Sequence, residues 1–156
     1  MRFFQHYVKN QVKSQSYAVP RYISQLFEIV NWLCKVRGYK TVIKFFPHEV
    51  ADMEPVVELL HFQSTEDWWI PYVLILWLSI IVLVPFDIET IDSLKGENKQ
   101  EILVKRMINI CKNFLTNSGK IREATAVLLA KLVSRPDVVK AGETDLILKF
   151  LADSYI

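Results

Sequence analysis

One stretch without charge, from position 68 to 86, constrains the fold of this chain more than any other feature: "WWIPYVLILWLSIIVLVPF". It covers 19 positions, close to the run of about 20 apolar residues that a helix needs to cross a bilayer. Two prolines shorten it, since Pro71 suits the first turn of a helix and Pro85 forces an end near Val84. The strongly apolar part, 72–84, covers roughly 20 Å as a helix, about two thirds of a bilayer core.

The flanks of this stretch also disfavour a membrane span. Acidic residues stand on both sides, Glu66 and Asp67 before it and Asp87 and Glu89 after it. The cluster of Lys or Arg expected on one side of an oriented span is missing. We therefore predict a buried core helix over 69–84 and no membrane span. Within this helix, Trp77 and Ser79 are then expected to lie inside a helical stack. Trp68 and Trp69 are expected at its entrance as packing or interface residues.

The first third of the chain shows helical periodicity. From about Tyr17 to Val36, apolar residues recur at intervals of three and four, the pattern of a single core-facing stripe, and Gly38 supplies a stop signal. One or two further turns follow and end at Pro47. The residues of the predicted stripe are Tyr22, Leu26, Ile29, Leu33 and Val36.

A second helix is predicted just before the charge-free stretch. Asp52 is a favourable N-cap residue, and Glu54 and Pro55 are tolerated in a first turn. Its predicted buried stripe consists of Val56, Leu59 and Leu60.

Three more helices are predicted beyond a polar loop at 86–99. They cover 100–115, 120–134 and the segment from 143 onward, with a turn at Asn117, Ser118 and Gly119 and a stop at Ser134–Pro136. The apolar positions that define them are Ile102, Leu103, Met107, Ile110, Cys111, Phe114 and Leu115 in the first; Ile121, Ala124, Leu128 and Leu132 in the second; and Leu146, Ile147, Phe150 and Leu151 in the third.

These helices form pairs. The pairs near 52–84 and 100–134 each join a helix by a short turn to a more apolar helix, and their offsets of about 48 and 51 residues are close to the 40–47 of HEAT and armadillo repeats. No period-two run with hairpin signals predicts a strand. We predict an all-α, HEAT/armadillo-like solenoid of about three helix pairs, a partial repeat segment over 1–156 with partial pairs at 1–46 and 141–156.

Charge is distributed in blocks, although the net charge is only +2. Positions 1–44 carry +7, positions 45–99 carry −8 and positions 100–156 carry +3. Such blocks can form faces that steer protein partners, or they can be ordinary solvated surface. Basic residues do not cluster with interleaved aromatic residues, which argues against binding to nucleic acid.

Residues that could carry chemistry are few and scattered. His6, His48 and His61 lack the spacing of a metal-binding pair, and "PHE" at 47–49 is expected to be an exposed turn. The acidic pairs Asp52/Glu54 and Glu66/Asp67 have a sufficient structural role at helix starts. We predict no catalytic, cofactor-binding or metal-binding residue and no cofactor.

The two cysteines and the start of the chain give further expectations. Cys34 and Cys111 stand far apart in apolar helical patterns, as expected of buried free thiols in a reducing compartment. No signal peptide is expected from "MRFFQHYVKNQVKSQ".

Three phrases resemble one family. "CKVRGYKTVIKFFPHEVADMEPVVELL" (34–60), "LILWLSIIVLVPFD" (74–87) and "SGKIREATAVLLAKLVSRPDV" (118–138) are similar to tubulin-folding cofactor D, also called tubulin-specific chaperone D, in the same order. The likeness covers nearly all of 22–139. It implies a segment from the N-terminal part of a much longer solenoid, and we expect apolar surface at both ends.

What the resemblance implies is a cytoplasmic, microtubule-associated chaperone that is not itself an enzyme. Members of that family bind β-tubulin, assemble and take apart the αβ-tubulin dimer, and with cofactors C and E stimulate GTP hydrolysis by tubulin. They also bind a small Arf-like GTPase. The GTP is held by tubulin, and the family has no short catalytic motif. The alternative is a generic HEAT-repeat interaction scaffold in another complex.

Overall fold

The computed structural model describes residues 5–8, 10, 19–63, 66–85, 88, 100–140 and 142–154. Within these ranges every regular element is a helix, and no strand occurs. The fold is an all-α helical-repeat solenoid, as the sequence predicts. Its elements are α2 (Arg21–Arg37), α3 (Tyr39–Val42), the 3₁₀ turns η1 (Ile43–Phe45) and η2 (Val50–Asp52), α4 (Met53–His61), α5 (Trp69–Ile81), α6 (Gln100–Leu115), α7 (Lys120–Val133), α8 (Pro136–Lys140) and α9 (Glu143–Ser154).

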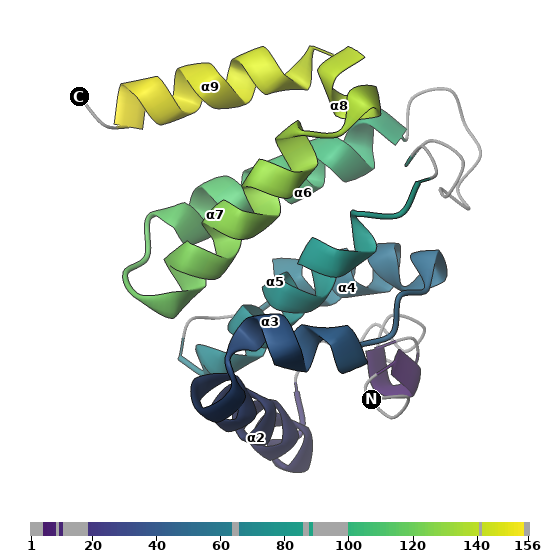
Figure 1. Cartoon of the computed structure of the whole chain (residues 1–156), viewed down its shortest axis with the longest axis vertical. Coiled ribbons are helices and arrows are strands. Elements are labelled where there is room, and N and C mark those ends of the chain that lie inside the picture. The colour runs from purple at the N-terminus through teal and green to yellow at the C-terminus, as the bar shows by residue number, and fades with distance from the viewer. Residues whose placement is uncertain are drawn as a thin grey trace.

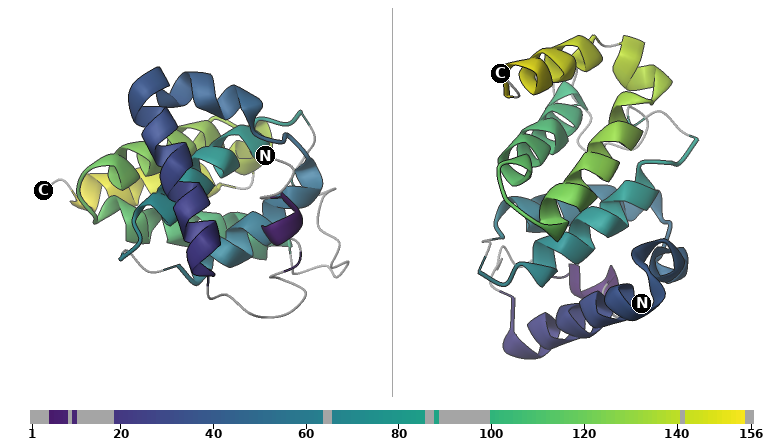
Figure 2. Two further views of the ribbon diagram at one scale, coloured as in Figure 1. Left: turned by 90° about the horizontal axis from the view of Figure 1, so that it is seen from below. Right: turned by 60° about the vertical axis from the view of Figure 1, so that its left-hand side comes forward.

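The helices stack in layers that follow the order of the chain. Figure 1 shows α2 and α3 at the lower end, α4 and α5 in the next layer, α6 and α7 above them, and α8 and α9 at the top. The first helices of the two central pairs, α4 and α6, contact each other, and so do the second helices, α5 and α7. Figure 2 shows the same succession from two other sides. This is the arrangement of a repeat array, in which each layer is buried by its neighbours.

Helix α5 forms the centre of the stack. It packs against α2 on one side and α7 on the other, and every residue of the helix except Trp69 and Ile80 is buried. Trp77 is 2% exposed and Ser79 is fully buried, so the prediction of a buried core helix is confirmed. Among the described residues, no helix is long and apolar enough to cross a membrane.

The end of α5 differs from the prediction. The helix ends at Ile81, and the chain continues through a turn at Val82 and Leu83, whereas the sequence predicts a helix to Val84. The cause is Pro85, which restricts the residue before it to extended backbone. The oxygens of Leu78, Ile80 and Ile81 accept turn hydrogen bonds from residues 82–84, so the oxygens beyond the helix end accept bonds from elsewhere.

The predicted core face of α2 is wrong, although the helix itself is present. Its start lies at Arg21, directly after Pro20, and position 17 lies outside the described residues. Four members of the predicted stripe are exposed, with fractions of 60% for Tyr22, 54% for Ile29, 49% for Leu33 and 78% for Val36. The buried face consists instead of Ile23, Phe27, Val30 and Cys34. The helix carries two apolar stripes, and packing against α5 selected the other one.

Asp52 stands at the N-cap position of α4, as predicted, but it makes no side-chain capping hydrogen bond. It has helical dihedral angles and closes the 3₁₀ turn η2. It is 1% exposed, because the 3₁₀ turn directs it into the protein. Glu54 does stand in the first turn of α4, and Val56, Leu59 and Leu60 are buried as predicted.

The predicted core positions in the later helices are confirmed wherever the structure describes their side chains. Leu103, Met107, Ile110, Cys111 and Phe114 of α6 and Ile121, Ala124, Leu128 and Leu132 of α7 are buried, and so is Ile147 of α9. Leu115 packs partly buried against the core, and Phe150 is half-buried. The side chains of Ile102, Leu146 and Leu151 and the loop at 86–99 apart from Ile88 lie outside the described residues.

Two further features join the layers. Pro136 ends α7 as predicted and also starts the short helix α8, since proline is well suited to a first helical position. Arg106 of α6 forms an ion pair of 3.0 Å with Glu58 of α4, so the acidic and basic blocks of the sequence meet at this interface. Whether these blocks form separate faces stays a prediction.

Candidate functional site

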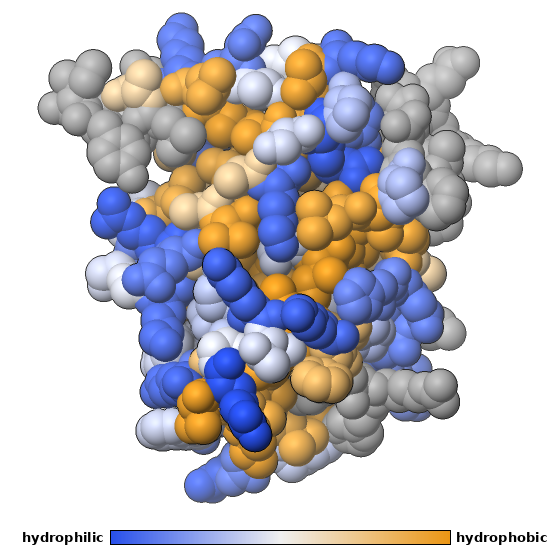
Figure 3. Space-filling view, viewed as in Figure 1, coloured by the Kyte–Doolittle hydropathy of each residue, from blue (hydrophilic) through white to orange (hydrophobic). Residues whose placement is uncertain are grey.

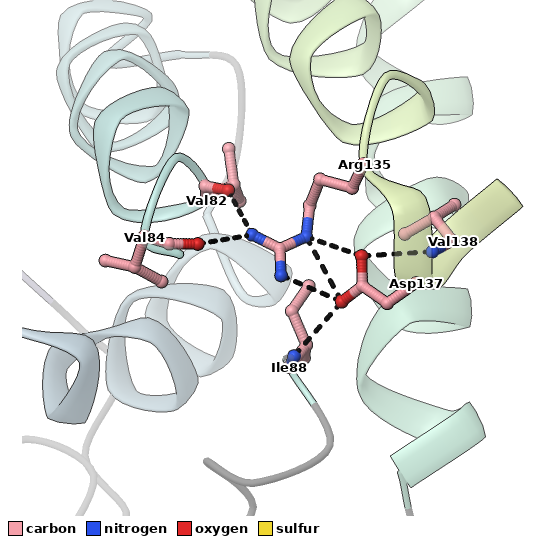
Figure 4. A network of polar contacts seen from close by, with 6 residues as sticks. All are labelled: Val82, Val84, Ile88, Arg135, Asp137 and Val138. Carbon is pink, nitrogen blue, oxygen red and sulfur yellow. Dashed lines mark hydrogen bonds and ion pairs between the residues drawn. The ribbon is translucent and has the colours of Figure 1, made fainter. Parts of the chain in front are cut away.

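The most elaborate polar arrangement is centred on Arg135, between the ends of α5 and α7 (Figure 4). Its Nη1 donates hydrogen bonds to the backbone oxygens of Val82 and, at 3.0 Å, Val84. Its Nε and Nη2 donate to the Asp137 carboxylate at 2.9 and 2.8 Å. That carboxylate also accepts the backbone N–H of Ile88 at 3.1 Å. We call these five residues the Arg135 network.

The network has a clear physical cause. Pro85 ends α5 and leaves carbonyl groups without partners in the helix, and a guanidinium has five N–H donors in a planar fork that can serve several acceptors at once. The Arg135 side chain is only 9% exposed, and a charge at such depth needs a counter-ion. Burial alone raises the pKa of the Asp137 carboxyl, but its bonds from Arg135 and Ile88 prevail and lower it.

A groove of about 530 Å³ lies beside this network, between 82–85 and 130–137. Leu83 on its rim is 57% exposed, and Figure 3 shows hydrophobic side chains gathered over the middle of this face. Lys131 donates to the backbone oxygen of Ser79 at 2.8 Å and to its Oγ at 3.3 Å, and burial lowers the pKa of the Lys131 ammonium. Lys131 therefore joins α7 to α5 like Arg135, and it is already occupied by these bonds.

The junction between α2 and α5 uses weaker groups. Trp69 donates from Nε1 to Ser24 Oγ at 3.1 Å, and Ser24 Oγ donates to Asp67 Oδ2 at 3.1 Å. Further along α5, Trp77 donates from Nε1 to the Pro47 oxygen at 2.9 Å. Of the two tryptophans expected at the entrance of the stack, Trp69 thus forms a hydrogen bond between layers, and Trp68 packs partly buried against the core.

The scattered polar residues of the sequence stay apart in the structure. His6 bonds to Asn10 at 2.9 Å, His61 packs edge-on against Phe62, and His48 is exposed. Among the described residues, no three or more His, Cys, Asp or Glu side chains converge as metal ligands would. The sequence predicts no catalytic, cofactor-binding or metal-binding residue, and this stays a prediction.

The two cysteines are buried free thiols, as predicted. Burial raises the pKa of Cys34, although Lys120 and Tyr72 oppose the shift. Burial also raises the pKa of Cys111 to about 12. Since the thiolate is the reactive form, both side chains are unsuited to nucleophilic chemistry at neutral pH.

Sequence reasoning missed two features of this site. Arg135 stands in "SRPDV", which predicts a helix stop and belongs to one of the phrases that resemble the family. The Arg-Pro-Asp spacing after a buried helix is the available signal for the network. The outward apolar face of α2 was assigned to the core, because two stripes of similar strength run along one helix. Near the lower end of Figure 3, hydrophobic patches over α2 alternate with hydrophilic side chains.

Stacked helix pairs with a continuous core and a partly apolar outer surface define the class as an armadillo-like helical-repeat protein. Residues 1–153 match the family described as tubulin-specific chaperone D-like, ARM repeat. The chain belongs to this family, which confirms the resemblance found in the sequence.

Two curated relatives agree with this assignment. A tubulin-folding cofactor D of Schizosaccharomyces pombe is 35% identical over 124 residues, covering 79% of this chain and 10% of that protein. A tubulin-specific chaperone D of Dictyostelium discoideum is 23% identical over 191 residues, covering 74% of this chain and 13% of that protein. The chain thus spans about a tenth of the length of these relatives. No solved structure matches.

Proposed function

We propose that this chain acts in tubulin folding as a helical-repeat binding segment that contacts β-tubulin. The observation that carries the proposal is the family match over residues 1–153. A stacked solenoid suits this role, because it presents a long surface on which a large client can be held while the scaffold remains folded. The Arg135 network contributes by fixing the relation between layers.

The finer parts of the proposal concern the whole assembly. We infer assembly and disassembly of the αβ-tubulin dimer, together with cofactors C and E and a small Arf-like GTPase, in the cytoplasm and at microtubules. Stimulation of GTP hydrolysis would act on GTP held by tubulin, so this chain needs no cofactor of its own. The support is the resemblance of its phrases to tubulin-folding cofactor D.

Binding to newly folded tubulin tests the proposal directly. The chain is immobilised and exposed to α- and β-tubulin released from a chaperonin, with an unrelated HEAT-repeat protein of similar size and charge as the control. We expect β-tubulin to be enriched over both the control surface and α-tubulin. Equal retention on the two surfaces would contradict the proposal and favour a generic HEAT-repeat scaffold.

A further inference from the structure

We draw no further inference here: the strongest candidate, the exposed apolar face of α2 formed by Tyr22, Ile29, Leu33 and Val36, lies in an end layer of the stack, and nothing in the described part of the chain shows what covers it.

Discussion

The two junctions of helix α5 are built differently. Against α7, it is held by the Arg135 network and by Lys131, whose charged donors serve backbone carbonyls at the end of the helix. Against α2, it is held by neutral donors, Trp69 Nε1 and the Ser24 hydroxyl, which in turn donates to the exposed Asp67 carboxylate. Charged donors form stronger hydrogen bonds than neutral ones, and leaving their partners buried and alone costs more.

The difference assigns different roles to the two sides of the stack. The α5–α7 junction keeps two successive repeats in one fixed relation. The α2 layer packs through Ile23 and Phe27 but leaves a second apolar stripe exposed, formed by Tyr22, Ile29, Leu33 and Val36. One side of α5 is therefore specialised for rigidity and the other presents a surface, and the variants below separate these roles.

The largest expected effect comes from removing the guanidinium. Arg135→Met leaves Asp137 without its counter-ion and the Val82 and Val84 oxygens without donors, which should lower the free energy of unfolding by about 3–5 kcal/mol. Urea unfolding followed by circular dichroism measures it. Arg37→Met on the exposed edge of α2 is the control and should stay within about 0.5 kcal/mol. Similar losses of stability in both variants would show that the α5–α7 junction contributes no more than an exposed residue.

The next largest effect contrasts two leucines. Leu78 of α5 is fully buried, whereas Leu33 of α2 is 49% exposed. Leu78→Ala should cost about 2–5 kcal/mol because it opens a cavity in the core, and Leu33→Ala should stay within about 0.5 kcal/mol. The same urea titration measures both. A large loss at Leu33 would mean that this side chain is covered within the chain and contradict its exposed position.

A smaller effect is expected at the α2–α5 junction. Ser24→Ala removes both the acceptor of Trp69 Nε1 and the donor to the exposed Asp67 carboxylate. It should cost about 1–2 kcal/mol, the net value of one neutral hydrogen bond and one exposed hydrogen bond to a charged group. Ser134→Ala is the matched control, since the Ser134 hydroxyl bonds only locally in the structure, to the Ala130 oxygen at 2.7 Å. A cost at Ser24 as large as that at Arg135 would refute the ranking of the two junctions.

The smallest expected effect is a loss of folding stability at acidic pH. The pKa of Asp137 is lowered in the folded state, so its contribution to stability is fully present above the ordinary aspartate pKa of about 3.9 and is lost as pH falls below it. Thermal unfolding followed over a series of acidic pH values measures this loss. Asp137→Asn should flatten the dependence, and Ser24→Ala should preserve it. An unchanged dependence in Asp137→Asn would contradict the assignment.

The helices could be predicted from the sequence because their signals are local. The bounds of α6 follow from its apolar spacing, and α7 ends where Ser134 and Pro136 predict. The buried face of α2 could not be predicted, because two apolar stripes on one helix carry nearly equal signals and only the neighbour that packs on one of them decides. The position of Asp52 at the start of α4 could also be predicted, but its burial could not, since the 3₁₀ turn η2 precedes it.

By itself, the sequence determined that the chain is helical, that helices pair at repeat-like intervals and that the charge-free stretch contains a core helix, because length, proline positions and periodicity are properties of neighbouring residues. Only the tertiary structure decided that Arg135 joins α7 to the end of α5 and that α2 turns one apolar stripe outward. Both depend on contacts between residues far apart in the chain, such as Val82 and Arg135, which are separated by 53 positions. The local spacing of residues does not reveal such contacts.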